Sequence, residues 1–146
     1  IARPLGKLTV VNCASPHYLT RFGYPQSPDD LTSHAIVRYT PHLGVHPLGF
    51  EVASVNGVQW FKSGGMLTVN SRENYLAAGL AGLGIIQIPR IAVREALRAG
   101  RLIEVLPGYR AEPLSLSLIY PQRRELSRRV NLFMQWLAGV MKEYLD

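Results

Sequence analysis

"AAGLAGLGIIQIPR" occupies residues 77–90 and places Gly79, Gly82 and Gly84 ahead of an apolar run. Glycines at this spacing can form a phosphate-binding loop, which would indicate a nucleotide enzyme. In such a loop a strand comes first and a helix last, so that the start of the helix faces the phosphate. Here a helical pattern precedes the glycines, and the strand-like IIQIP follows them. We therefore interpret Gly82 and Gly84 as the turn that ends a helix and leads into a strand.

The helix before these glycines has its own start signal. Asn70, Ser71, Arg72 and Glu73 have the spacing of a capping box, with Asn70 as the N-cap and Glu73 at the third helical position. The apolar side of this helix consists of Tyr75, Ala78, Leu80, Ala81 and Leu83. The β-rich MLTVN, residues 66–70, runs directly into the helix, so this region predicts the order strand, helix, glycine turn, strand.

The rest of the chain continues this alternation. Apolar runs predict strands at 8–14, 35–39 and 101–106, and a segment that alternates and then runs apolar predicts a strand at 114–120. Proline-capped or periodic segments predict helices at 17–22, from Pro28, at 91–99 and at about 128–144. Asn56-Gly57 predicts a hairpin with a type I′ turn. The order of elements predicts an α/β fold with mainly parallel strands and helices on both faces.

Composition limits the class of protein. The chain has 146 residues, 47% of them hydrophobic, which suffices for one compact domain or two small lobes. A single cysteine, Cys13, excludes an intramolecular disulfide and fits a reducing compartment. No apolar run reaches the roughly 18 residues that a membrane span needs, and the first residues lack the layout of a signal peptide. We expect a cytoplasmic protein with no membrane partner.

The net charge of +6 raises the question of nucleic acid binding. The basic residues are mostly spread singly, and the one cluster, RRELSRR at 123–129, is interrupted by Glu125. We interpret this cluster as a solvated loop and helix start. Direct DNA binding through Arg123, Arg124, Arg128 and Arg129 stays open as an alternative, which a salt-sensitive gel shift would support.

No arrangement of residues predicts catalysis or metal binding. His42 and His46 are four residues apart, but Pro41, Gly44 and Pro47 exclude a helix that would bring them together. The other two histidines are His17 and His34. Cys13 lies in an apolar strand, which favours a core thiol over a nucleophile. We therefore expect no enzymatic activity, no metal and no cofactor.

The strand-to-helix junction at Asn70 and Ser71 is the best candidate for a binding site. In open α/β sheets, ligands lie beyond the carboxyl ends of strands, where helices begin. The junction offers backbone N–H groups, a partial positive charge, an amide and a hydroxyl, with Arg72 adjacent. A small carboxylate would suit it. The alternative is that these residues only cap the helix.

Taken in order, these motifs resemble the effector-binding region of LysR-type transcriptional regulators. The first 39 residues, from IARPLGKLTVVNCASPHYL to AIVRY, resemble the middle of that region. NYLAAGLAGLGIIQIPR resembles the helix, glycine turn and strand that follow, and AGRLIEVLPGY with LSLSLIYPQRRELSRRVNLFMQWLAGVM resembles its closing segment. The ordered series of these segments covers essentially the whole chain.

The resemblance implies a fold similar to type II periplasmic binding proteins, in which two α/β lobes joined by two crossing strands hold a ligand in the cleft. It implies that residues 1–14 form a crossing strand from a partial first lobe and that residues 15–113 form the second lobe. Residues 114–146 would form the return strand and the closing helix of the first lobe. The family's N-terminal winged helix-turn-helix and the first half of lobe one have no counterpart here. We therefore expect an incomplete first lobe that favours self-association as a homo-oligomer.

The resemblance also assigns the site. The family's cleft is lined by the junction that matches Val69, Asn70, Ser71 and Arg72, by the first crossing strand at Asn12 and Cys13, and by the region after VRY, represented by Tyr39. The implied function is sensing of a small, anionic effector that modulates DNA binding by the missing N-terminal domain.

Two other classes remain open at this stage. One is a solute-binding protein of the same fold, which would need an export signal. The other is an enzyme on a related two-lobe scaffold, which would need a catalytic side chain in the cleft.

Overall fold

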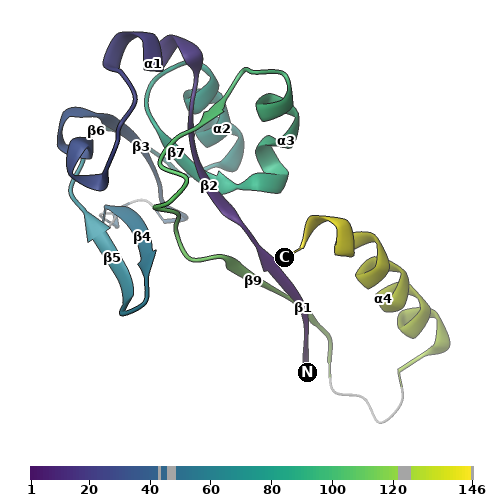
Figure 1. The fold of residues 1–146 in the computed structure, drawn as a ribbon. Coiled ribbons are helices and arrows are strands. Elements are labelled where there is room, and N and C mark those ends of the chain that lie inside the picture. Colours follow the sequence, from purple (N-terminus) through teal and green to yellow (C-terminus); the bar gives the residue numbers. More distant parts are fainter. Residues whose placement is uncertain (43, 46–48, 122–125, 146) are drawn as a thin grey trace. The chain divides into compact units, whose positions relative to one another are not determined.

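A computed structural model describes residues 1–42, 44–45, 49–121 and 126–145, with the side chain of Met66 excepted. It divides into two compact units (Figure 1). Unit 1 consists of Ile1–Thr9 and Pro113–Asp146, and unit 2 consists of Val10–Glu112. The lobe assignment of residues 1–14, 15–113 and 114–146 stays a prediction.

Unit 2 is built around strand β2 (Val10–Ala14), in which every residue is buried. β2 lies between β7 (Ile86–Pro89) and β8 (Ile103–Glu104), and both neighbours run antiparallel to it. A strand with a partner on each side and side chains buried on both faces reads as a continuous apolar run, which is why the sequence predicted it.

The other strands of unit 2 form two pairs. β3 (Ala35–Tyr39) pairs in parallel with β6 (Gly64–Val69), and β4 (Phe50–Ser54) forms an antiparallel hairpin with β5 (Gly57–Phe61). The prediction of mainly parallel pairing is wrong, because in the described part of the chain only the β3–β6 ladder and one isolated bridge are parallel. A helix between two strands makes them parallel only when they are neighbours, and β7, which follows β6 and a helix, pairs with β2 instead.

The hairpin is confirmed but its turn is not the predicted one. A type I′ turn needs positive φ at both central residues. The register pairs Ser54 with Gly57, so the two central residues are Val55 and Asn56, one position before the predicted pair. Neither has a positive φ, because the one described non-glycine residue with positive φ is Leu106. Gly57, with a φ of 108°, follows the turn as the first residue of β5.

Local capping signals place the helices of unit 2. α1 (Pro16–Phe22) begins after Ser15, whose Oγ accepts a hydrogen bond from the Tyr18 N–H at 3.2 Å. Pro28–Ser33 form a 3₁₀ helix, η1, where the sequence predicted a helix start. α2 (Arg72–Leu80) and α3 (Arg90–Arg98) flank the glycine turn and β7.

The glycine turn quoted at the outset is confirmed, and two distances explain it. Gly82 has a φ of 78°, which favours glycine because other residues are strained there. A Cβ on Gly84 would lie 2.7 Å from the Ala35 carbonyl oxygen. The chain needs this close approach because the Ile85 N–H donates to that same oxygen at 2.9 Å. The glycines thus let the chain after α2 pack against β3.

The core of unit 2 consists of two clusters of buried side chains. The cluster beside α2 and α3 contains Val11, Cys13, Val37, Tyr75, Ala78, Ile86, Ile88, Val93, Ala96 and Leu102. The cluster beside α1 and the hairpin contains Ala14, Tyr18, Leu19, Leu31, Ile36, Phe50, Val52, Ile85, Val105 and Leu106. Each large side chain buried there contributes about 1.5–3 kcal/mol, so together they fix β2, β3 and β7, the strands nearest the candidate site.

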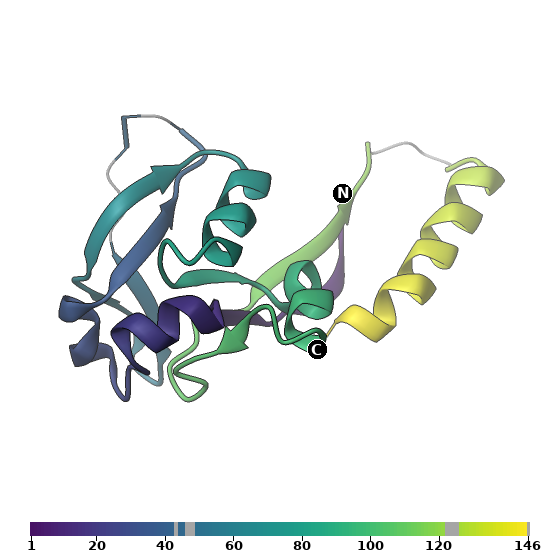
Figure 2. The same cartoon turned by 90° about the horizontal axis from the view of Figure 1, so that it is seen from above.

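Unit 1 contains a two-stranded sheet and the last helix. β1 (Ala2–Leu8) pairs antiparallel with β9 (Leu114–Ile119), and both views show the two strands side by side (Figures 1 and 2). The family resemblance placed residues 1–14 in a crossing strand, but the residue pattern alone predicted a strand only from Leu8, because Pro4 and Gly6 interrupt the pattern of β1. The register of the β1–β9 pair shifts between these two residues. α4 (Arg128–Met141) continues into a 3₁₀ turn, η2 (Lys142–Tyr144), as the apolar periodicity predicted.

Candidate functional site

The junction between β6 and α2 has a helix cap one residue later than predicted. Ser71, not Asn70, is the N-cap: its Oγ accepts the Asn74 N–H at 3.1 Å, and its carbonyl accepts the Tyr75 N–H at 3.0 Å. The capping-box prediction was wrong because Ser71 has the same three-residue spacing to an N–H donor. Among the hydrogen bonds of the described residues, none involves the exposed side chain of Asn70.

This arrangement leaves an electropositive helix start. The N–H groups of Arg72 and Glu73 lie in the first turn of α2, where a helix has no preceding carbonyl to accept them. The partial positive charge of the helix start adds to the guanidinium of Arg72, and the Glu73 carboxylate offsets part of it. An anion or a polar ligand group at this point would accept hydrogen bonds that the protein itself does not use.

β3 brings an aromatic ring to the same place. In the parallel β3–β6 ladder Tyr39 pairs with Val69, and the Thr40 N–H donates to the Val69 carbonyl at 2.9 Å. The side chain of Tyr39 is 39% exposed, and its ring centroid lies 5.7 Å from that of Tyr75, one turn into α2. The structure therefore places Val69, Asn70, Ser71, Arg72 and Tyr39 together at the carboxyl ends of two adjacent strands.

Tyr75 is a buried residue of α2 that connects the helix to β7. Burial raises the pKa of Tyr75 to about 12, so its hydroxyl stays protonated at neutral pH. That hydroxyl accepts the Gln87 N–H at 2.8 Å, which ties α2 to β7.

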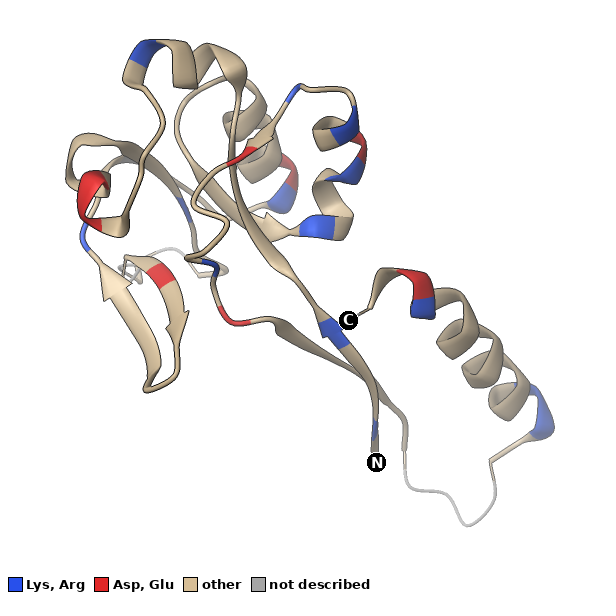
Figure 3. Cartoon of the chain, in the orientation of Figure 1, with Lys and Arg blue, Asp and Glu red and all other residues tan. Residues whose placement is uncertain are grey.

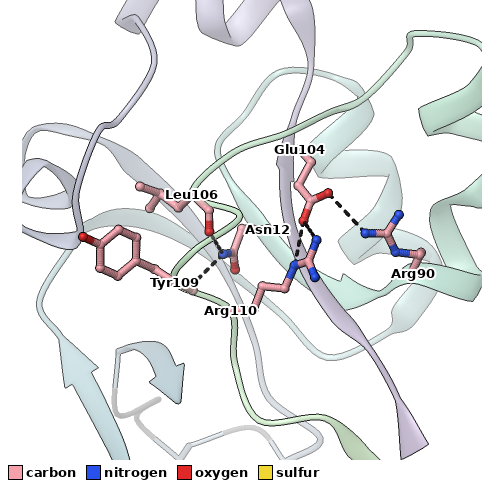
Figure 4. A network of polar contacts seen from close by, with 6 residues as sticks. All are labelled: Asn12, Arg90, Glu104, Leu106, Tyr109 and Arg110. Carbon is pink, nitrogen blue, oxygen red and sulfur yellow. Dashed lines mark hydrogen bonds and ion pairs between the residues drawn. The ribbon is translucent and has the colours of Figure 1, made fainter. Parts of the chain in front are cut away.

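Asn12 lies in a buried network of polar contacts (Figure 4). The Asn12 side chain is 0% exposed; its Nδ2 donates to the carbonyls of Tyr109 at 2.9 Å and Leu106 at 3.3 Å. Its Oδ1 accepts from Gln87 Nε2 at 2.9 Å. In this structure Asn12 therefore offers no surface to a ligand, and its amide holds the chain after β8 against β2.

Cys13 is equally inaccessible. It is 0% exposed, and burial, with a smaller contribution from the Glu104 charge, raises the pKa of its thiol to about 12. A thiol with that pKa is a poor nucleophile at neutral pH.

Gln87 is the residue that the sequence analysis missed. Its Oε1 accepts the Glu51 N–H at 3.0 Å, and its Nε2 donates to the Glu51 carbonyl at 2.8 Å as well as to Asn12. It thereby joins β7, β2 and the hairpin. The available signal was its position as the one polar side chain in the apolar run IIQIP.

Beside this network, Glu104 lies between two arginines (Figure 4). Its carboxylate accepts from Arg110 Nε at 2.8 Å and from Arg90 Nη2 at 3.3 Å. The two arginines come from the start of α3 and from the segment after β8. The trio therefore carries a net positive charge at the edge of unit 2.

Among the described residues, the remaining histidine candidates do not come together as a site. His34 is buried, and its Nδ1 lies 2.8 Å from the Tyr18 hydroxyl, whereas His17 and His42 are exposed. His46, Arg123 and Arg124 lie outside the described residues. Within the described ranges no three His, Cys, Asp or Glu side chains gather as a metal site would require. In the same ranges, no helix combines the length and the apolar character needed to cross a bilayer.

Comparison with known proteins identifies the class. The LysR substrate binding domain family matches residues 1–142. The chain therefore belongs to this family, and its fold is the two-lobe, periplasmic-binding-protein-like α/β fold of LysR regulatory domains, as the sequence predicted.

Particular relatives agree with this assignment. The chain is 97% identical over its full length to the HTH-type transcriptional regulator YhjC of Escherichia coli (strain K12), of which it covers 49%. It is 35% identical, over 89% of the chain, to 44% of an HTH-type transcriptional regulator of Haemophilus influenzae. The full-length structure of the Vibrio cholerae virulence activator AphB is similar with a TM-score of 0.80 and 25% identity, over 96% of this chain and 47% of that one. The chain spans about half the length of the curated relatives it matches.

These relatives also bear on the two alternative classes. They are transcriptional regulators, which does not favour a solute-binding protein and implies a role other than catalysis.

Proposed function

We propose that this chain is the effector-sensing region of a cytoplasmic, LysR-type transcriptional regulator and that a small anionic effector binds at the β6–α2 junction. Binding there would modulate the DNA affinity of a longer protein. The observation that carries the proposal is the start of α2, where the exposed Asn70, the cap residue Ser71 and the exposed Arg72 adjoin two helical N–H groups without helical acceptors.

Each proposed contact has its own chemistry. The N–H groups of Arg72 and Glu73 and the guanidinium of Arg72 would donate to a carboxylate. Asn70 would provide a donor and an acceptor for a second polar group, and the exposed face of Tyr39 would cover an apolar part of the effector. Asn12 and Cys13 do not enter this proposal, because their buried side chains have no free surface.

The test is the thermal shift of the chain with a panel of small carboxylates. A ligand at one hundred times its Kd stabilises by about 2.7 kcal/mol, so a true effector gives a clear shift. Ser71→Ala and Asn70→Ala should reduce that shift.

Ser127→Ala is the matched control, because Ser127 caps α4 in the same way, accepting the Val130 N–H at 3.3 Å. It should lose helix stability and keep the full ligand-induced shift. An effector whose shift is unchanged in both Ser71→Ala and Asn70→Ala would contradict the proposed site. No response to any carboxylate would contradict an anionic effector.

We further propose that the protein acts as a homo-oligomer. Within the described residues β1 and β9 have each other as their one sheet partner, which leaves both outer edges able to pair. Leu132, Phe133 and Trp136 of α4 are 56–59% exposed, an unusual exposure for large apolar side chains. Light scattering after size-exclusion chromatography tests this proposal, and a strictly monomeric chain at high concentration would contradict it.

A further inference from the structure

The positive charge of unit 2 is concentrated in one short segment. Residues 90–110 contain five arginines and two glutamates, a net charge of +3. The rest of unit 2 contains four basic and five acidic residues, a net charge of −1. Figure 3 shows the basic positions gathered along α3 and the turn after it.

The helix presents these arginines in a row. Val93 and Ala96 are buried, which fixes the inner side of α3 against the core. Arg90, Arg94 and Arg98 follow each other at intervals of four residues and are all exposed. At a rise of about 1.5 Å per residue the row is about 12 Å long, and its members lie on one side of the helix.

Arg101 extends the row beyond the end of α3. Gly100 has a φ of 68°, and the Arg101 N–H donates to the Ala96 carbonyl at 2.8 Å, so the turn that carries this exposed arginine is hydrogen-bonded to the helix. Two carboxylates of the same segment lie beside the row: Glu95 pairs with Arg98 at 3.3 Å, and Glu104 pairs with Arg90 and Arg110. These pairs orient three of the five arginines, and the segment still keeps its net charge of +3.

We infer that this arginine row, Arg90, Arg94, Arg98 and Arg101, is a contact surface for the phosphate backbone of duplex DNA. The inference rests on the proposed function, in which the chain belongs to a regulator that operates on DNA. All basic residues of the segment are arginines, whose planar guanidinium forms paired hydrogen bonds with phosphate oxygens. The row would bind without reading sequence and would hold the sensing region against DNA.

Two other partner classes fit this surface less well. Tight protein partners need a central apolar or aromatic anchor, and the one large apolar side chain that α3 exposes is Ile91, at 39%. A membrane-surface helix must insert its apolar side, but the apolar side of α3 is buried in the core of unit 2.

The experiment measures binding of the 146-residue chain to a labelled duplex of arbitrary sequence by fluorescence anisotropy over a series of salt concentrations. The variant Arg94→Gln/Arg98→Gln/Arg101→Gln removes three arginines and retains the Arg90–Glu104–Arg110 trio. Each phosphate contact contributes about one unit to the slope of log K against log salt concentration. We expect the variant to lower that slope by about 3 and to weaken binding at least tenfold at low salt.

The control variant Arg3→Gln/Lys7→Gln/Lys62→Gln removes the same charge from exposed positions elsewhere and should bind nearly as well as the unchanged chain. Equal losses in both variants, or no salt-dependent binding by the unchanged chain, would overturn the inference. If the chain bound poly-glutamate more tightly than duplex DNA, the partner of the arginine row would be an acidic protein. That result would also overturn the inference. The row variant should keep any carboxylate-induced thermal shift, so failure here is separate from failure of the effector site.

Discussion

Replacing Asn12 distinguishes a structural residue from a ligand contact. In Asn12→Ala the carbonyls of Tyr109 and Leu106 lose their amide donor, and Gln87 Nε2 loses one of its two acceptors. The 2.9 Å bonds to Tyr109 and Gln87 contribute about 1 kcal/mol each, and the bond to Leu106 contributes less because it is longer. The sum is a loss of about 2–3 kcal/mol in the free energy of unfolding.

Asn12→Asp sharpens this prediction. The aspartate has the same shape and keeps the acceptor for Gln87, but it turns a donor into a second oxygen facing two carbonyls. We expect it to destabilise at least as much as alanine, because a buried charge that faces two carbonyl oxygens and has Gln87 as its one donor is costly. Urea denaturation monitored by circular dichroism measures the free energy of unfolding of both Asn12 variants. Asn74→Ala, on the exposed side of α2, is the control. A change of less than about 0.5 kcal/mol in Asn12→Ala, or a stable aspartate variant, would refute the structural role.

Three further predictions follow from single contacts. Gly84→Ala should destabilise by about 1–3 kcal/mol because its Cβ meets the Ala35 carbonyl, whereas Gly108→Ala, with no atom within 4 Å, should not; chemical denaturation compares them. Cys13 should resist alkylation at pH 8 in the native chain and react fully in urea, because burial raises its pKa to about 12; rapid native labelling would contradict this. Burial lowers the pKa of His34, so the unfolded chain binds a proton more readily and stability should fall as pH drops through and below 6.5. His34→Gln should flatten that part of the pH profile, and an unchanged profile would count against it.

The features that the sequence predicted depend on neighbours along the chain. The glycine turn follows from backbone conformation at Gly82 and from the order helix, glycine, strand, both of which are local. The start of α1 was likewise predicted from two adjacent residues, the N-cap Ser15 and Pro16 at the first helical position. α4 was predicted because its apolar residues repeat at helical intervals over 14 residues.

The features that the sequence could not predict depend on distant partners. The acceptors of Asn12 lie 94 and 97 residues away along the chain, and its donor Gln87 lies 75 away. No local pattern distinguishes an asparagine with such partners from one that faces a cleft. The family resemblance placed Asn12 at the site by its position on the strand, whereas burial within unit 2 decides what its side chain contacts.

The one-residue shift of the α2 cap has a consequence for the site itself. If Asn70 capped the helix, replacing it with alanine would lower the free energy of unfolding by about 1 kcal/mol. Helix capping alone would then account for an asparagine at this position. The cap is Ser71, so Ser71→Ala should lower the free energy of unfolding by about 0.5–2 kcal/mol. Asn70→Ala should change it by less than about 0.5 kcal/mol, as surface substitutions do.

Urea denaturation of both variants without ligand measures this difference. A destabilisation of Asn70→Ala equal to that of Ser71→Ala would return Asn70 to the role of a cap. If Ser71→Ala is destabilised and Asn70→Ala is not, the start of α2 is intact in Asn70→Ala. A weaker binding of carboxylate by that variant would then reflect the loss of a contact between the Asn70 amide and the ligand.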